Sequence, residues 1–275
     1  MADIRVWVDG ELVGDRPSIS ALDHGVTVGD GVFETCKVVD GEVFALQRHH
    51  DRLDRSLKGL GLPTADRDLL DQGIAAVLAD GLDFGRVRYS VTAGAGPLGS
   101  ERLDDRLTYI VLAGPVPRPP ATTAICTVPW TRNERSAVAG LKTTSYAENV
   151  VALAHAKERG GTEAIFANTR GELCEGTGSN IFVVVDGEIL SPPVESGLLP
   201  GITRDLVLEW GRDAGLPVRE ATMPLEVLQS CDEVFITSST RDVQAVSRVD
   251  DREVPAPGPL TRRMAEVFKE RAAGE

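Results

Sequence analysis

Hydrophobic and polar residues alternate along the first third of the chain, which is typical of β-strands with one buried face. The alternation is clearest at residues 31–46, where Asp40-Gly41 favours a two-residue hairpin turn between strands. Leucines then recur at helical spacing over residues 47–61, until a glycine and a proline end the pattern. We therefore expect a hairpin followed by a helix.

The same two patterns, alternation for strands and helical spacing for helices, predict the remaining elements. Further strands are expected at residues 4–8, 9–12, 86–92, 107–113, 124–128, 163–167 and 181–185. Further helices are expected at 66–79, just after Lys142, at 203–214 and at 260–271. A proline-rich stretch near residues 115–122 is too stiff and too poor in N–H donors to continue a central strand. We expect a domain boundary there.

These elements predict an α+β protein of two domains. We expect a small N-terminal α/β domain over residues 1–116, a linker over 117–122 and a larger C-terminal domain over 123–275. The chain has no GxxxxGK[ST] loop and no repeat of fixed period, and its GxGxxG match, GAGPLG at residues 94–99, lies between two predicted strands and does not open a helix as a dinucleotide turn does. Nicotinamide or ATP enzymes of the common kinds are therefore disfavoured, and so are solenoids.

Composition and charge narrow the possible partners. The chain has 275 residues, of which 42% are hydrophobic and 26% are charged, values near those of ordinary globular proteins. Its net charge of −13 would repel nucleic acids and acidic membranes. No apolar stretch approaches the roughly 20 residues that span a bilayer, and no leader pattern precedes the first strand. We expect a cytoplasmic protein without nucleic-acid or membrane partners.

The cysteines and histidines do not form a metal-binding pattern. The four cysteines lack CxxC pairing, and the four histidines lack HExxH spacing. We expect buried free thiols and no metal centre, so another set of residues must carry any chemistry.

Two kinds of donor suggest a phosphate site, namely backbone N–H groups at a helix start and hydroxyls at a strand end. The candidates are Ile202 and Thr203, which follow Pro200-Gly201, Ser239 and Thr240, which follow an apolar strand, and Arg52 on the first long helix. An ordinary capped helix, a serine-rich turn and a solvated arginine are the alternative interpretations.

Glu175 and Lys142 complete a possible cofactor site. Glu175 precedes a strongly apolar strand, so we expect it to be partly buried and to need a positive or hydrogen-bonding partner. A protonated pyridine nitrogen would serve, and Lys142 would supply an amine for an aldehyde. A phosphorylated pyridine aldehyde needs an amine, a carboxylate and an anion cradle, and the sequence offers a candidate for each. Taken alone, each residue is more often a solvated surface residue.

Six ordered motifs make the chain similar to the class IV (fold type IV) pyridoxal-phosphate enzymes. That family includes branched-chain aminotransferases, D-amino-acid and (R)-amine aminotransferases, and aminodeoxychorismate lyases. The matching motifs are DHGVTVGDGVFET (23–35), HHDRL (49–53), LKTTSYAEN (141–149), GTEAIFANTRGELCEGTGSNIF (161–182), LPGITRD (199–205) and DEVFITSST (232–240). The resemblance covers nearly the whole sequence.

The resemblance implies pyridoxal 5'-phosphate as cofactor, with Lys142 as the Schiff-base lysine and Glu175 as the partner of the pyridine nitrogen. It makes Arg52 a phosphate ligand and places Tyr146 near the ring hydroxyl of the cofactor. It also implies a small two-layer α/β lobe, a larger cofactor-binding lobe around a barrel-like sheet, and a homodimer. The partners would be a small-molecule amino donor and a 2-oxo acid acceptor.

The residues that bind the substrate carboxylate are harder to assign. Ala93, Leu98 and Ser100 stand where D-amino-acid aminotransferases often carry an arginine and a histidine. Lys37 and Arg88 lie on strands that could line the cleft, so we expect them to replace that carboxylate site. Phe33 completes the predicted substrate-binding set, and Arg86 and Arg102 are weaker candidates.

The motifs leave several activities open. The stretch GDGVFETCKVVDG is closest to the D-amino-acid group, so transamination of a D-amino acid or (R)-amine is the first prediction. Aminodeoxychorismate lyase, which releases pyruvate and 4-aminobenzoate, is the alternative. Branched-chain L-amino-acid transamination ranks lower, because FET and RVRYSV depart from that group's patterns. A non-catalytic phosphate-binding protein is the remaining possibility.

Overall fold

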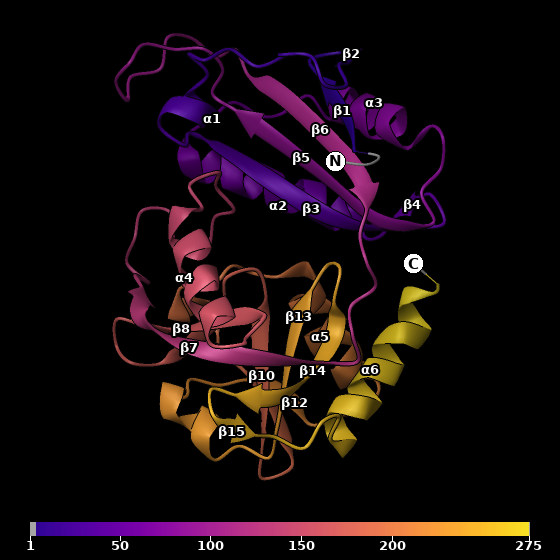
Figure 1. Ribbon diagram of the computed structural model, residues 1–275, viewed down its shortest axis with the longest axis vertical. Helices are drawn as coiled ribbons and strands as arrows, with labels where there is room; N and C mark the ends of the chain where they lie inside the picture. Colours follow the sequence, from indigo (N-terminus) through magenta and orange to yellow (C-terminus); the bar gives the residue numbers. More distant parts are fainter. Residues whose placement is uncertain (1–3, 275) are drawn as a thin grey trace. The chain divides into compact units, whose positions relative to one another are not determined.

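The computed structural model describes residues 4–274, which divide into two compact units (Figure 1). The first unit comprises Met1–Arg118 and Leu141–Tyr146, and the second comprises Pro119–Gly140 and Ala147–Glu275. Leu141–Tyr146, which contains Lys142, thus groups with the first unit, whereas the division expected from the sequence left it in the C-terminal domain. None of the helices in the described part of the chain is long and apolar enough to cross a membrane.

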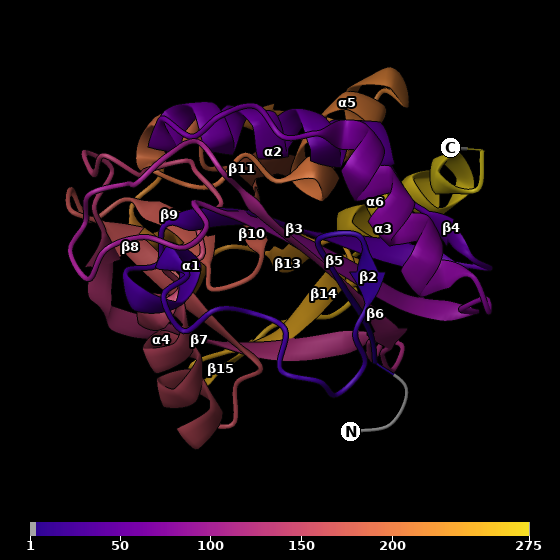
Figure 2. The same ribbon diagram turned by 90° about the horizontal axis from the view of Figure 1, so that it is seen from above.

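The first unit is built on a six-stranded antiparallel sheet in the order β2-β1-β6-β5-β3-β4, in which β3, β5 and β6 run side by side (Figures 1 and 2). Its strands are β1 (Arg5–Val8), β2 (Glu11–Leu12), β3 (Gly31–Val39), β4 (Glu42–Val43), β5 (Phe84–Thr92) and β6 (Thr108–Pro115). The β3–β4 hairpin turns at Asp40 and Gly41, whose φ angles of 51° and 84° are those of the predicted two-residue turn.

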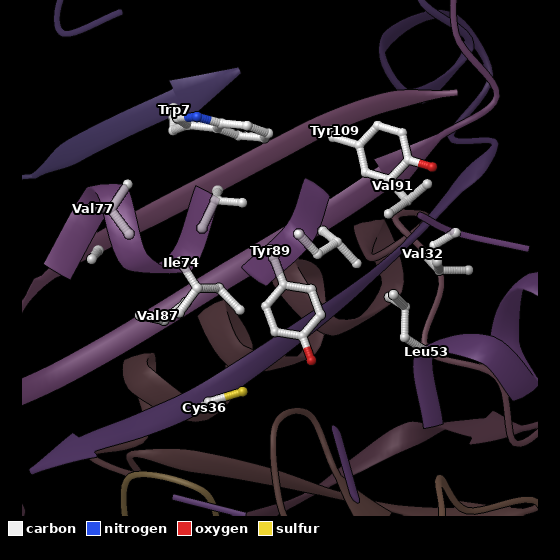
Figure 3. Close-up of a cluster of buried hydrophobic side chains, with 14 of the residues drawn as sticks. Trp7, Val32, Cys36, Leu53, Ile74, Val77, Val87, Tyr89, Val91 and Tyr109 are labelled. Carbon is white, nitrogen blue, oxygen red and sulfur yellow. The ribbon is translucent and has the colours of Figure 1, made fainter. Parts of the chain in front are cut away.

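Two helices pack against the sheet of the first unit, α2 (Leu46–Leu60) against β3 and α3 (Arg67–Leu78) against β6 and β1. A single turn, α1 (His24–Thr27), precedes β3. The alternation seen in the sequence places every second strand residue in the core beneath these helices. Figure 3 shows the aromatic side chains of Trp7, Tyr89 and Tyr109 in this core, among valine, leucine and isoleucine. Burial of this apolar surface stabilises the unit.

The second unit is built on a nine-stranded mixed sheet. Along the path β12-β11-β10-β13-β14-β7-β8-β9, the pairs β11–β12, β14–β7 and β7–β8 are parallel and β15 joins β14. The strands are β7 (Thr122–Arg132), β8 (Glu163–Asn168), β9 (Leu173–Gly176), β10 (Asn180–Val185), β11 (Glu188–Ser191), β12 (Val218–Glu220), β13 (Glu233–Ser238), β14 (Asp242–Val249) and β15 (Arg252–Glu253).

Three long helices cover this sheet. The helix α4 (Ala147–Glu158) packs against β7 and β8 in both views (Figures 1 and 2), while α5 (Ile202–Asp213) and α6 (Pro259–Ala272) pack against each other and against β13. Two short 3-10 turns, η1 (Val194–Ser196) and η2 (Leu225–Gln229), lie in the connections. All four cysteines are buried free thiols, as expected.

The strands β10 and β13 are buried on both faces. On one face, Ile181, Val183, Val234 and Ile236 belong to the main core of the second unit. On the other face, Phe182 stacks on its cross-strand partner Phe235 with ring centroids 4.7 Å apart. This explains why both strands are continuous apolar runs rather than alternating patterns.

The four long helices predicted outside the lysine region are observed as α2, α3, α5 and α6, with ends shifted by one or two residues. The short strand β9 was not predicted, and it includes Glu175, which the sequence placed between a strand and a turn. A four-residue strand with the sequence LCEG has too little alternation to be recognised from its pattern.

Replacement of Gly73 by alanine should destabilise the first unit. A Cβ atom at this position would lie 2.8 Å from Cε3 of Trp7 and 2.8 Å from Cγ2 of Val111, both fully packed core side chains. Alanine favours the helix by about 1 kcal/mol, but overpacking a rigid core costs about 1–3 kcal/mol. We expect a net loss of about 1 kcal/mol in urea unfolding. The exposed neighbour Gln72→Ala is the control, and equal stability of both variants would contradict this packing argument.

Candidate functional site

The predicted reactive lysine lies on a segment that is bonded to β3 and α2 within the first unit. The carbonyl of Lys142 accepts the N–H of Phe33 at 3.0 Å, and the N–H of Thr144 donates to the carbonyl of Gly31 at 2.8 Å. The N–H of Lys142 donates to Oγ of Ser56 on α2 at 3.1 Å. The backbone of Lys142 is therefore fixed to the beginning of β3, which positions its side chain.

The side chain of Lys142 lies among aromatic groups. Its Nζ donates to the hydroxyl of Tyr146 at 3.1 Å and lies 4.2 Å from the ring centroid of Phe33. The rings of Phe33 and Tyr146 meet edge to face, with centroids 5.0 Å apart. The structure thus brings together Phe33, Lys142 and Tyr146, three residues predicted from the sequence.

Arg88 approaches the same aromatic ring. Its Cζ lies 3.6 Å from the ring centroid of Phe33, a close cation–π contact. Burial lowers the pKa of the Arg88 guanidinium, an effect that Tyr146 opposes and Arg86 reinforces. Among residues 4–274 no carboxylate forms an ion pair with Arg88. A half-buried guanidinium of this kind is suited to bind an anionic ligand.

Lys37 and Arg102, two other candidates for binding the substrate carboxylate, have different surroundings. Lys37 is buried, and its Nζ lies 4.6 Å from the ring centroid of Phe44. Arg102 forms two hydrogen bonds with Asp30, at 2.7 and 2.8 Å, and donates to two backbone carbonyls at the end of α2. Arg102 therefore has a structural role, and Arg88 is the stronger candidate for binding an anion.

Arg52, the predicted phosphate ligand, is buried and held by a carboxylate. Its Nε and one terminal nitrogen donate to the two oxygens of Glu34 at 2.8 and 2.7 Å. Nδ1 of His49 donates to the same carboxylate at 2.7 Å. Burial alone would raise the pKa of Glu34, but the charge and hydrogen bonds of Arg52, with the bond from His49, lower it to about 2. Glu34 fixes the guanidinium in one orientation.

In the second unit, Glu175 is buried on β9, where its carboxylate contacts a backbone N–H and a guanidinium. One oxygen accepts the N–H of Leu199 at 2.9 Å, and the other lies 3.2 Å from Nε of Arg132. Arg132 also pairs with Glu148 and stacks over the ring of Phe166 at 4.1 Å. The expectation of a partly buried Glu175 with a positive partner holds, and Arg132 provides that charge within the protein.

The helix α5 begins as the phosphate interpretation requires. Its N-cap is Gly201, no side chain of the described residues caps it, and the first two helical residues, Ile202 and Thr203, are both buried. The first N–H groups of an α-helix have no partner within the helix, so they are available to an anion. Ser239 and Thr240 are half-buried at the turn that joins β13 to β14. Their hydroxyls thus lie at the end of an apolar strand, as the sequence predicted.

Three residues of the candidate site were not identified from the sequence, namely Glu34, His49 and Arg132. A signal existed for the first two: Glu34 occupies a core position of β3 between Val32 and Cys36, and His49 lies on the buried stripe of α2. Arg132 carries no such signal, because it ends a long strand in a polar stretch.

The donors and acceptors match a phosphorylated pyridine aldehyde in kind. The first unit holds an amine beside a tyrosine hydroxyl and a buried arginine, and the second holds a buried carboxylate and an uncapped helix start. Each of these groups is fixed by contacts within its own unit. Both sets therefore fit the group that the sequence motifs imply.

Comparison with known proteins agrees with this assignment. The model of the family described as amino-transferase class IV matches residues 31–249. The chain is 32% identical to a "Putative branched-chain-amino-acid aminotransferase" of Methanocaldococcus jannaschii, over 97% of this chain and 96% of that protein. It is 27% identical to a D-alanine aminotransferase of Staphylococcus haemolyticus, over 96% of each protein.

The fold is that of a solved branched-chain aminotransferase. The structure resembles the Thermoproteus uzoniensis enzyme, crystallised with norvaline, with a TM-score of 0.91 and 28% identity. The likeness covers 98% of this chain and 95% of that one. The fold class predicted from the sequence is thereby confirmed.

Glu34 should make the free energy of unfolding depend on pH. Its pKa is lowered on folding from 4.5 to about 2, so its stabilising contribution is complete above pH 4.5 and is lost as the pH falls toward 2. Burial also lowers the pKa of His49, so protonation of that imidazole opposes folding below its ordinary pKa of 6.5. We expect Glu34→Gln to cost about 3–5 kcal/mol in urea unfolding at pH 7, because Arg52 loses its counter-charge.

The control is the same substitution in the surface ion pair between Glu188 and Arg219, where Glu188→Gln should change stability little. The difference between wild type and Glu34→Gln should shrink as the pH falls from 4.5 to 2. A difference that stays constant over that range would show that Glu34 is not the titrating group.

Proposed function

Because the chain belongs to the class IV aminotransferases, which depend on pyridoxal phosphate, we propose that it moves the amino group of an amino acid to a 2-oxo acid. One observation carries the proposal: Lys142 and Arg88 both contact the ring of Phe33. This places a nucleophilic amine near a guanidinium that can hold the carboxylate of the same substrate.

Bound pyridoxal phosphate would supply an aldehyde that accepts the amino group and an electron-poor ring that accepts the electrons of the Cα–H bond. Glu175 would hold the ring nitrogen. Arg52, the N–H groups of Ile202 and Thr203, and the hydroxyls of Ser239 and Thr240 would hold the phosphate. These assignments rest on the sequence motifs and on the groups that each residue presents.

Lys142 would bind the cofactor covalently and then act as the base that carries the proton of the substrate Cα. Its hydrogen bond to Tyr146 holds Nζ in one direction, and the ring of Phe33 keeps water from one side of the amine. The backbone bonds to Phe33 and Ser56 limit the movement of the lysine. A fixed base of this kind reduces the entropy that must be lost during proton transfer.

We propose branched-chain L-amino acids as the first substrate class. The 32% identical relative carries that name, and the similar Thermoproteus uzoniensis structure contains norvaline, an amino acid with an unbranched alkyl side chain. Arg88 favours a donor that bears a carboxylate over a simple (R)-amine. This order differs from the first prediction made from the sequence motifs.

A D-amino acid is the second candidate. Several relatives named D-alanine aminotransferase are 26–29% identical over nearly the whole chain, and the motifs around β3 resemble that group. We infer that the same Lys142 and Arg88 would serve either enantiomer, since Arg88 recognises the carboxylate alone. The sequence resemblance implies a homodimer, and the cytoplasmic location stays an expectation from the apolar pattern of the sequence.

The first test follows the bound cofactor spectroscopically. Addition of L-leucine without an acceptor should move its visible absorbance band into the near ultraviolet, and 2-oxoglutarate should restore it. Lys142→Ala should slow this conversion by about 100-fold or more, because the base is lost. Lys157→Ala, an exposed lysine on α4, is the control. A shift with D-alanine but not with L-leucine would favour the second candidate, and no shift with either would overturn the proposal.

The second test concerns the substrate carboxylate. Arg88→Met should raise KM for L-leucine by about 10-fold to 100-fold, because a charge-assisted hydrogen bond is removed. The rate with isobutylamine, which has no carboxylate, should be unchanged. Arg86→Met removes an exposed arginine of the same strand and should leave both donors unaffected. Equal losses on both donors in Arg88→Met would show that this arginine does not bind the carboxylate.

A further inference from the structure

The hydroxyl of Thr237 is buried without a partner. Thr237 is 1% exposed, and within residues 4–274 its Oγ1 makes no hydrogen bond. A buried hydroxyl without a partner destabilises a protein, because its hydrogen bonds to water are lost on folding and not replaced. A ligand atom beside Thr237 would remove this cost.

The side chain of Thr237 lies on the face of the sheet that carries α5. Thr237 pairs directly with Asn180 across β13 and β10, and directly paired residues of antiparallel strands share one face. Nδ2 of Asn180 donates to the carbonyl of Leu199 at 3.0 Å, so this face is directed toward the turn that precedes α5.

The start of α5 approaches Asn180 closely. A Cβ atom added to Gly201, the N-cap of α5, would lie 1.8 Å from Oδ1 of Asn180. Any residue with a Cβ atom at position 201 would therefore force the helix start or Asn180 to shift. The uncapped N–H groups of α5 are thus next to the Asn180–Thr237 pair.

Both the backbone N–H and the backbone carbonyl of Leu199 are hydrogen-bonded. Its N–H donates to Glu175 at 2.9 Å, and its carbonyl accepts from Asn180. Glu175 and Asn180 together fix the turn between residues 199 and 201. The position of the start of α5 relative to the Thr237 hydroxyl is therefore fixed within the second unit.

We propose that Thr237 is a further ligand of the anion bound at the start of α5, donating its hydroxyl hydrogen to a phosphate oxygen directly or through one water. The inference rests on the proposed function, which makes that anion the phosphate of pyridoxal phosphate. It adds a buried threonine to the hydroxyls of Ser239 and Thr240, which lie beyond it on the β13–β14 turn.

The test compares cofactors with and without the phosphate. The full-length chain, stripped of cofactor, is titrated with pyridoxal phosphate and with pyridoxal. Thr237→Val keeps the shape of the side chain and removes the hydroxyl, so it should weaken the binding of pyridoxal phosphate by about 10-fold. The binding of pyridoxal should not change. Thr237→Ser should restore most of the affinity.

Thr261→Val is the matched control. Thr261 is also 1% exposed, and its Oγ1 also lacks a partner in the described chain, but it lies on the first turn of α6. Its replacement should leave the ratio of the two affinities unchanged. The melting temperature of the cofactor-free Thr237→Val chain should equal or exceed that of the wild type, since the hydroxyl has no protein partner among the described residues.

The outcomes separate this inference from the proposed function. If wild-type protein binds pyridoxal phosphate but Thr237→Val leaves the affinity ratio unchanged, the role of Thr237 is excluded and the proposed function stands. If Thr237→Val weakens both cofactors equally, its effect is on packing and the inference is also wrong. If wild-type protein binds neither cofactor, the proposed function itself fails.

Discussion

Glu34 sets the arrangement of the first unit. Its carboxylate lies on the core face of β3 with no exposure to solvent, where an unpaired charge would cost several kcal/mol. Arg52 donates two hydrogen bonds to this carboxylate, and His49, on the same helix, donates a third. The helix α2 must therefore pack against β3 in one register, since a shift would leave both charges buried and unpaired.

The same helix also determines where the lysine lies. Ser56, one turn beyond Arg52, accepts the N–H of Lys142, while β3 binds the carbonyl of that residue. The buried ion pair and the proposed reactive amine of Lys142 are thus connected through the backbones of α2 and β3. In the second unit the backbone of Leu199 is fixed in a similar way, because Glu175 accepts its N–H and Asn180 donates to its carbonyl. In both units, a polar group in the core fixes a backbone segment of the candidate site.

Sequence patterns predicted the long elements well, because the helical stripe of α2 and the alternation of β3 each result from burial of one side. Motif resemblance pointed to Lys142 and Glu175, because the chemical roles proposed for them require particular residue types. It did not reveal Arg132, since an arginine at the end of a strand looks solvated until its neighbours are known. Nor did it reveal Thr237, whose lack of a partner in the described chain depends on three-dimensional packing rather than on local pattern.

The division of the chain into two units also affects how the protein folds during its synthesis. The first unit includes Leu141–Tyr146, so its sheet lacks the segment bridged to Val32 until more than half of the polypeptide has left the ribosome. Until then the first residues of β3 have no partner for the N–H of Phe33 and the carbonyl of Gly31. Nascent chains of this protein therefore pass through a stage in which the N-terminal unit is largely translated but unfinished at one edge.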